Sequence, residues 1–160
     1  MLQRFVNWLK GVKPQRKIAF IDGDQELHAA LKAYDTYVAN TGTETHFVRL
    51  APPPNHKEPK LLQHRNDFNR VYVEGTAGKE VVDKFIAGYI QRAVAEGYTH
   101  ITVVSNDYDF IDIFKMAVMI NEQASDVTFR MVVPFAQGRM AELPAQVSNI
   151  EVVKVRTKHR

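Results

Sequence analysis

Residues 101–110 read ITVVSNDYDF, four mostly apolar residues followed within a few positions by two acids, Asp107 and Asp109. A short apolar run of this kind is typical of a strand buried in a parallel sheet. A second such step occurs early in the chain, where residues 18–24 read IAFIDGD. Open α/β sheets bind ligands outside the carboxyl ends of their strands. The sequence therefore predicts carboxylates at one edge of a parallel sheet, where they suit a hard cation such as Mg²⁺ or Mn²⁺.

Strand and helix patterns alternate along the chain, which is typical of a three-layer α/β fold. We expect a mostly parallel sheet of about five strands, flanked by helices. The strand patterns fall at residues 17–22, 45–50, 71–73, 100–104, 127–133 and 150–155. Apolar residues recur with helical spacing in residues 27–38, 79–96 and 109–120.

The composition excludes several classes of protein. The 160 residues suit one domain with a core of its own, and the absence of cysteine excludes disulfides, zinc–thiolate sites and thiol catalysis. No apolar run approaches the roughly 20 residues of a membrane-spanning helix. Residues 1–17 also lack the apolar segment of a secretory signal. We expect a cytoplasmic protein with no integral membrane segment.

Charge is distributed unevenly along the chain. Residues 1–17 carry +5 and residues 151–160 carry +3, which leaves −5 on the segment between them. Basic ends can hold a polyanion beside an acidic site, and they are equally consistent with solvated termini.

This pattern divides the chain into three parts: a basic amphipathic helix over residues 1–16, a domain over 17–156 and a basic tail over 157–160. The helix could pack on its own core, on a second copy or other protein partner, or on a membrane surface.

Three blocks of sequence together resemble the NYN/PIN-like nuclease superfamily. They are an apolar strand ending in Asp22-Gly23-Asp24-Gln25, the helix start Gly78-Lys79-Glu80-Val81-Val82-Asp83, and Ser105-Asn106-Asp107-Tyr108-Asp109-Phe110 after a strand. They occur in the order typical of the family and cover about residues 17–133. The chain departs from the family pattern at Gln25, where Asn is usual, and at Glu80, which adds a negative charge.

The resemblance implies a Rossmann-like core and a metal-dependent endoribonuclease. By that analogy, Mg²⁺ or Mn²⁺ would be held by Asp22, Asp83, Asp107 and Asp109. Ser105 would donate to a carboxylate or phosphate, and Lys79 would neutralise charge in the transition state. Asp24, Gln25 and Glu80 would have secondary roles.

A long loop follows Pro52-Pro53-Pro54, and basic residues are frequent in and after it. Long loops in compact domains are often functional. We expect RNA to contact its basic side chains, namely Lys57, Lys60, Arg65 and Arg70. Phe68 and Tyr72 are candidates for stacking on bases.

Simpler interpretations remain open for several acids. Asp24 and Asp109 have the positions of helix N-caps, and Asp83 could be a surface residue paired with Lys79 or Lys84. Two other functions also remain open. One is an RNA-binding or protein-interaction module of the same fold with a weakened site. The other is a haloacid-dehalogenase-like phosphatase, because Asp22-x-Asp24 resembles that family's catalytic pair.

Overall fold

The computed structural model describes residues 2, 14–75 and 80–155. The predicted N-terminal helix, the basic tail and Lys79 therefore lie wholly or almost wholly outside the described residues. The elements are β1 (Lys17–Asp22), α2 (Leu27–Tyr37), β2 (Glu44–Leu50), α3 (Lys60–Gln63), β3 (Asn69–Val73), α4 (Val81–Ala95), β4 (His100–Val104), α5 (Asp109–Ile120), η1 (Glu122–Asp126), β5 (Thr128–Val133), α6 (Arg139–Glu142), β6 (Gln146–Val147) and β7 (Ile150–Lys154).

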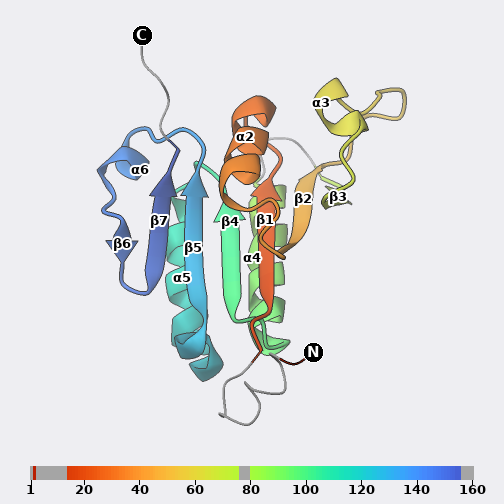
Figure 1. The fold of residues 1–160 in the computed structure, drawn as a ribbon. Coiled ribbons are helices and arrows are strands. Elements are labelled where there is room, and N and C mark those ends of the chain that lie inside the picture. The colour runs from red at the N-terminus through yellow and green to blue at the C-terminus, as the bar shows by residue number, and fades with distance from the viewer. Residues whose placement is uncertain (1, 3–13, 76–79, 156–160) are drawn as a thin grey trace.

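The strands form one sheet in the order β3-β2-β1-β4-β5-β7-β6. All neighbouring strands are parallel except β6 and β7. The predicted α/β fold is confirmed, and it is a three-layer, Rossmann-like arrangement (Figure 1). The expected count of about five strands was too low, since the sheet has seven in the part of the chain that the structure describes. The edge strand β6 has only two residues, which is too few to show the alternation of apolar and polar residues that indicates a strand.

Helices cover both faces of the sheet. Figure 1 shows α4 and α5 behind the sheet and α2 in front of it. On the first face Ile86 of α4 and Phe114 of α5 pack with Phe20 and Phe129 of the strands. On the second, Leu31 and other residues of α2 pack with a smaller cluster. Strands buried on both faces explain the continuous apolar runs of the sequence. No helix in the described part of the chain is long and apolar enough to cross a membrane.

Asp24 and Asp109 are not the helix N-caps that the simpler interpretation of the sequence predicts. Helix α2 is capped by Glu26, whose carboxylate accepts hydrogen bonds from the backbone nitrogens of the two residues that follow Leu27. Asp24 does not cap it. Asp109 lies inside the first turn of α5, and its nitrogen donates to Asp107 Oδ1 over 2.9 Å. The N-cap residue of α5 is Tyr108, whose side chain makes no capping hydrogen bond, so neither aspartate has the expected capping role.

The chain reverses its direction of travel across the sheet at β1. It passes from β1 to β2 and β3 on one side, and then crosses to β4 on the other side of β1. In the parallel pairing of β1 with β4, Ile21 lies opposite Val104. Asp22 and Ser105, the next residues on each strand, are therefore placed beside each other at the carboxyl edge. A ligand crevice forms at such a switch point.

Gly23 allows β1 and β2 to stay close at this edge. Its nitrogen donates to Val48 O over 2.7 Å. A Cβ at position 23 would lie 2.6 Å from that oxygen and 2.7 Å from Arg49 Cβ. The small residue between the two aspartates is thus required by packing against the neighbouring backbone.

We predict that Gly23→Ala lowers the free energy of unfolding by about 1–3 kcal/mol, because the strand ends must separate to accommodate the methyl group. The control is Gly88→Ala within α4, where an added Cβ meets nothing within 4 Å. Alanine should stabilise that helix by about 0.5–1 kcal/mol. Urea denaturation of both variants measures the difference, and equal effects would contradict this account of Gly23.

Candidate functional site

Ser105 joins the ends of β1 and β4. It is fully buried, and its hydroxyl donates to Asp22 Oδ2 over 2.8 Å. The other carboxylate oxygen, Asp22 Oδ1, accepts from the nitrogen of Asp24 over 3.2 Å. Asp22 is only 2 % exposed, and burial raises its pKa to about 6 despite these hydrogen bonds. The carboxylate is thus held in one orientation by the two loops of the switch point.

Gln25 connects the same two loops through both ends of its amide. Its Nε2 donates to Ser105 Oγ over 2.7 Å, and its Oε1 accepts from the nitrogen of Asn106 over 2.8 Å. Asn106 in turn accepts from the nitrogen of Phe135, in the loop after β5. The longer side chain at position 25 therefore bonds to the β4–α5 loop, and its amide reaches Asp22 only through Ser105. Its role is to position the loops of the site.

Asp83, on the first turn of α4, brings a third segment to this edge. Partial burial, interaction with the Asp107 side chain and the nearby charges of Asp22 and Glu80 raise the pKa of Asp83 to about 8. Among the described residues no ion pair joins it to Lys84. Asp83 therefore lies within a group of acids rather than beside a compensating cation.

The most compact group of acids differs from the predicted set. Glu80, Asp83 and Asp109 each offer a carboxylate oxygen, and these oxygens all lie within 4.8 Å of one another. Glu80 precedes α4 with a φ of 52°, a left-handed conformation that is uncommon for a residue with a side chain. Asp22 and Asp107 are not in this group of three, although both lie near enough to Asp83 to raise its pKa.

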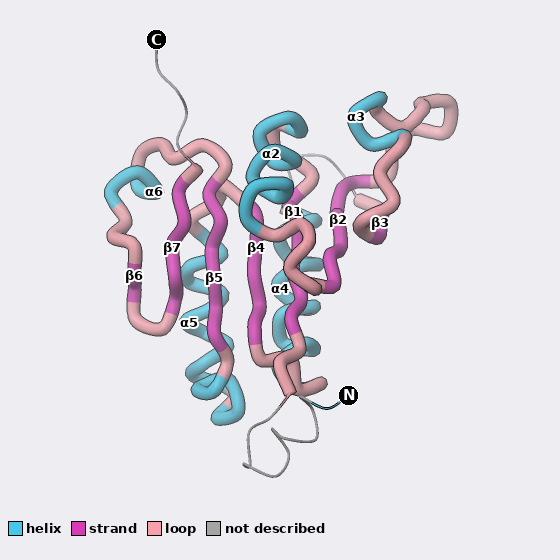
Figure 2. Tube along the Cα trace, viewed as in Figure 1, coloured by secondary structure: helices cyan, strands magenta, loops and turns pink. Residues whose placement is uncertain are grey.

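A hollow of about 420 Å³ is lined by these acids except Asp109. Its lining residues come from β1 and the loop after it, from β2, and from the starts of α4 and α5, namely Asp22, Asp24, Gln25, Leu50, Glu80, Asp83 and Asp107. No lining residue among those described is basic. The hollow combines carboxylate oxygens with one amide side chain, which is a donor set suited to a hard divalent cation. Figure 2 shows the loops that follow the strands at this edge.

Two of the four predicted RNA contacts are engaged in structural interactions. Arg65 Nη2 bonds to Asp35 over 2.6 Å and to Asp67 over 2.9 Å. Arg70 pairs with Glu58 and donates to the carbonyl oxygen of Leu62. Both guanidinium groups also lie over the ring of Phe68, which is 6 % exposed. These interactions hold the segment around α3 in place.

The other two predicted contacts, Lys57 and Lys60, are exposed. Lys57 lines a second, mainly basic hollow of about 470 Å³ together with Arg49, His56 and Tyr72. Its one acid, Glu58, pairs with Arg70. A third hollow of about 370 Å³ shares Asp24 and Gln25 with the acidic hollow and Arg49 with the basic one. The acidic and basic surfaces are therefore contiguous.

Sequence reasoning did not identify Arg49 or the positioning role of Gln25. Arg49 lies near the end of β2, and the signal that was available is the one used for Asp22, a charged residue where an apolar strand ends. The bonds of Gln25 reach residues 80 positions away, and no local pattern indicates them.

Comparisons of the chain with protein-family models, with curated proteins and with solved structures found no match. The interpretation of the site therefore depends on its geometry.

We predict that Asp83→Asn stabilises the metal-free protein at pH 8 by about 1 kcal/mol, a value reduced to allow for solvent screening. The native state retains the proton of Asp83 up to about pH 8, while the unfolded chain loses it near pH 4. Wild-type stability should therefore fall between these pH values as pH rises. The asparagine variant should lose less, because only the contribution of Asp22, whose pKa is raised to about 6, remains. Urea denaturation in EDTA at pH 4 and pH 8 measures the effect.

The matched control is Asp112→Asn, which alters an exposed carboxylate in the first turn of α5 outside the hollow. It should gain no stability at pH 8. A gain of the same size in both variants would mean that general charge, and not the group around Asp83, sets the pH dependence.

We also predict that Gln25→Asn lowers the free energy of unfolding by about 1–2 kcal/mol, because the shorter amide cannot bond to both Ser105 and the Asn106 nitrogen. Gln123→Asn, at an exposed position, should change it by no more than about 0.5 kcal/mol. Thermal or urea unfolding compares the two. No loss at position 25 would show that the amide does not connect the loops in solution.

Proposed function

We propose that this chain is a divalent-metal-dependent nuclease that hydrolyses phosphodiester bonds of RNA, related to the NYN/PIN-like proteins it resembles. One observation carries the proposal. Acids from three segments far apart in sequence, represented by Asp22, Asp83 and Asp107, line one hollow at the carboxyl edge of a parallel sheet. Packing alone does not favour this grouping, because like charges at short range oppose folding.

The donor set fits Mg²⁺ or Mn²⁺. Glu80, Asp83 and Asp109 have oxygens close enough to share one ion, and Asp107 lines the same hollow as Glu80 and Asp83. Oxygen ligands of this kind are those that hard cations prefer. A bound ion would offset the charge of an anionic substrate, polarise the phosphate and activate a water molecule.

The protein side chains would orient this chemistry. Ser105 and the Asp24 nitrogen fix the Asp22 carboxylate, and Gln25 holds the two loops together. The proton that Asp83 retains near neutral pH would leave when a cation binds, which makes binding favourable at higher pH. The role of Lys79 in neutralising charge remains part of the proposal, although this residue lies outside the described part of the chain.

The adjacent basic hollow supports a polyanionic substrate. Arg49, His56 and Lys57 line it, and Tyr72 is 44 % exposed there, so that its ring could stack on a base. A chain of phosphates bound along this surface would place one phosphodiester near the acids. Because the carboxylates would repel that phosphate, the basic residues and the ion are both needed.

The phosphatase alternative is less consistent with this geometry. Both oxygens of Asp22 accept hydrogen bonds, and its side chain is almost fully buried. These properties suit a positioned ligand better than a nucleophile that must reach phosphorus.

The test is cleavage of a labelled single-stranded RNA in Mn²⁺, Mg²⁺ or EDTA. We expect cleavage with either metal and none with EDTA. Asp83→Asn and Asp107→Asn should each reduce the rate by about 100-fold or more, because each removes a charged oxygen donor at the point of reaction. Asp112→Asn is the control, with an unchanged rate expected.

Metal-independent cleavage, or full activity in both site variants, would contradict the proposal. RNA binding that persists in EDTA with no cleavage under any condition would instead favour the binding-module alternative.

A further inference from the structure

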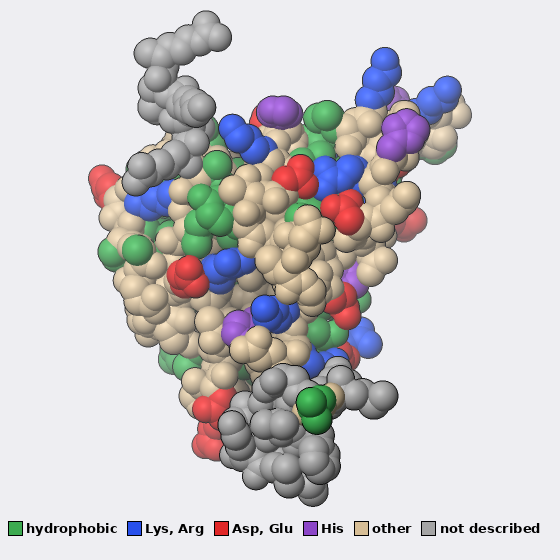
Figure 3. Space-filling view, viewed as in Figure 1, with side chains coloured by type: hydrophobic (Ala, Val, Ile, Leu, Met, Phe, Trp, Pro, Cys, Tyr) green, Lys and Arg blue, Asp and Glu red, His purple; other side chains and the backbone are tan. Residues whose placement is uncertain are grey.

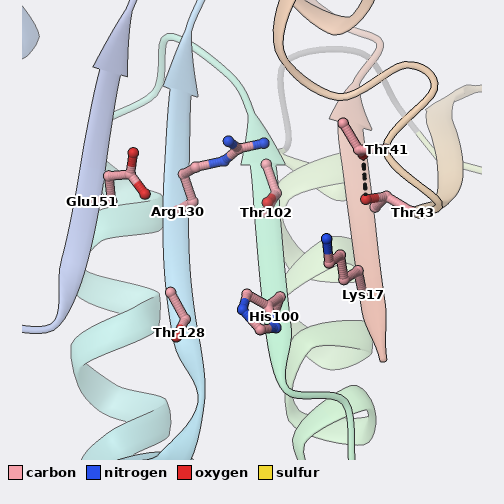
Figure 4. A pocket seen from close by; sticks show the side chains of 8 residues that line it. All are labelled: Lys17, Thr41, Thr43, His100, Thr102, Thr128, Arg130 and Glu151. Atoms are coloured by element: carbon pink, nitrogen blue, oxygen red, sulfur yellow. Dashed lines mark hydrogen bonds between the residues drawn. The ribbon is translucent and has the colours of Figure 1, made fainter. Parts of the chain in front are cut away.

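A separate hollow of about 150 Å³ lies on the face of the sheet that carries α2 (Figure 4). Its residues come mostly from the amino-terminal halves of the strands, with Lys17 and His100 at the starts of β1 and β4. Figure 1 shows that α2 covers the other end of this face. Figure 3 shows basic, acidic and histidine side chains together on the sheet face below α2. The hollow is thus distinct from the acidic site at the carboxyl edge.

Two permanent cations, Lys17 and Arg130, line this hollow without an acidic partner. In the described residues no carboxylate oxygen lies within 4.0 Å of a charged nitrogen of either side chain. Residues 1, 3–13, 76–79 and 156–160 contain no aspartate or glutamate that could supply one. Cations left in a concave surface concentrate anions there.

Arg130 is fixed in position. Its Nη2 donates to the carbonyl oxygen of Tyr37, the last residue of α2, over 2.9 Å. This bond uses one of the five donors of the guanidinium group. Among the described residues no other hydrogen bond or ion pair engages this group, and its planar fork matches the oxygens of a phosphate.

His100 also lines the hollow, between the strands that carry the two cations. Burial lowers its pKa first, and the charges of Lys17 and Arg130 lower it further. Its neutral ring bonds through Nδ1 to Thr99 Oγ1 over 2.8 Å. The imidazole therefore adds a polar wall to the hollow and does not require an anion itself.

Threonine hydroxyls complete the lining. Thr102 is only 6 % exposed, yet its hydroxyl has no hydrogen-bond partner among the described residues. Every fully buried polar side-chain atom in the described part of the structure does have a partner. The Thr102 hydroxyl must therefore face the open space of the hollow. Thr128 lines the same hollow one strand away.

The lining contains a single acid, Glu151, which forms no ion pair with either cation among the described residues. It lies on β7, and Figure 4 shows the guanidinium group of Arg130 extending toward Thr102, on the opposite side from Glu151. The volume is well below the roughly 300–1,000 Å³ of a site for a whole organic ligand. The hollow suits one small anion.

We propose that this hollow binds a phosphate-class oxyanion, with Lys17 and Arg130 as the charged donors and Thr102 as a hydroxyl donor. The anion is either free inorganic phosphate or the terminal phosphate of a nucleotide, which share this chemistry. The proposal is independent of the nuclease function, because it uses none of the acidic residues.

The test follows ¹H–¹⁵N NMR spectra of the full chain during titration with sodium phosphate at pH 7, with sodium chloride keeping the ionic strength constant. We expect saturable shifts centred on the amides of Thr102, Thr128 and Arg130. Lys17→Gln and Thr102→Val should each weaken the apparent affinity about 5- to 10-fold. Lys115→Gln, at an exposed position on α5, should leave it unchanged.

A second titration uses adenosine 5′-monophosphate. Tighter binding than phosphate assigns the hollow to a nucleotide's terminal phosphate, and equal or weaker binding assigns it to the free ion. Shifts that grow without saturation would overturn the proposal. An affinity for phosphate that is the same in Lys17→Gln as in the wild type would also overturn it. This variant should fold, because glutamine keeps the apolar part of the side chain and Lys17 is partly exposed.

Discussion

The hydroxyl of Ser105 is the contact on which the site depends. It donates to Asp22 and accepts from Gln25 and from the nitrogen of Asp107, so that one buried oxygen links the ends of β1 and β4. These strands meet where the chain reverses its direction across the sheet. The parallel register brings the two strand ends together, and this hydroxyl then sets the orientation of the acids. Without it, a buried carboxylate would lose its donor at a substantial cost in stability.

The clustered acids lower the stability of the folded protein, and burial of the apolar core must offset this loss. Asp22 and Asp83 both have raised pKa values, because burial and neighbouring carboxylates disfavour their ionised forms. The apolar layers on both faces of the sheet supply the opposing stability. A site that is unfavourable when empty and is relieved by a cation is a common property of functional clusters of acids. The molecule therefore has a physical reason to bind a positive ion at this edge.

The sequence predicted the fold well where local pattern decides it. Strands β1 and β4 were evident from apolar runs, and the edge on which their acids gather followed from parallel topology. Contacts between distant segments could not be derived in the same way. The left-handed conformation of Glu80 and its approach to Asp109 depend on how α4 packs, and the pairing of Arg65 with Asp35 depends on the path of the loop around α3. Both results arise from tertiary packing, which leaves no periodic pattern of apolar residues from which it could be predicted.

The most direct test of the account is to locate Mn²⁺ in crystals of this protein by its anomalous scattering. We predict a peak at the carboxyl edge, coordinated by carboxylate oxygens from the start of α4 and from the β4–α5 segment, with Asp83 among the ligands. Well-ordered crystals that show no peak there at millimolar Mn²⁺, or a peak held by residues of one segment alone, would contradict the claim that these distant acids act together.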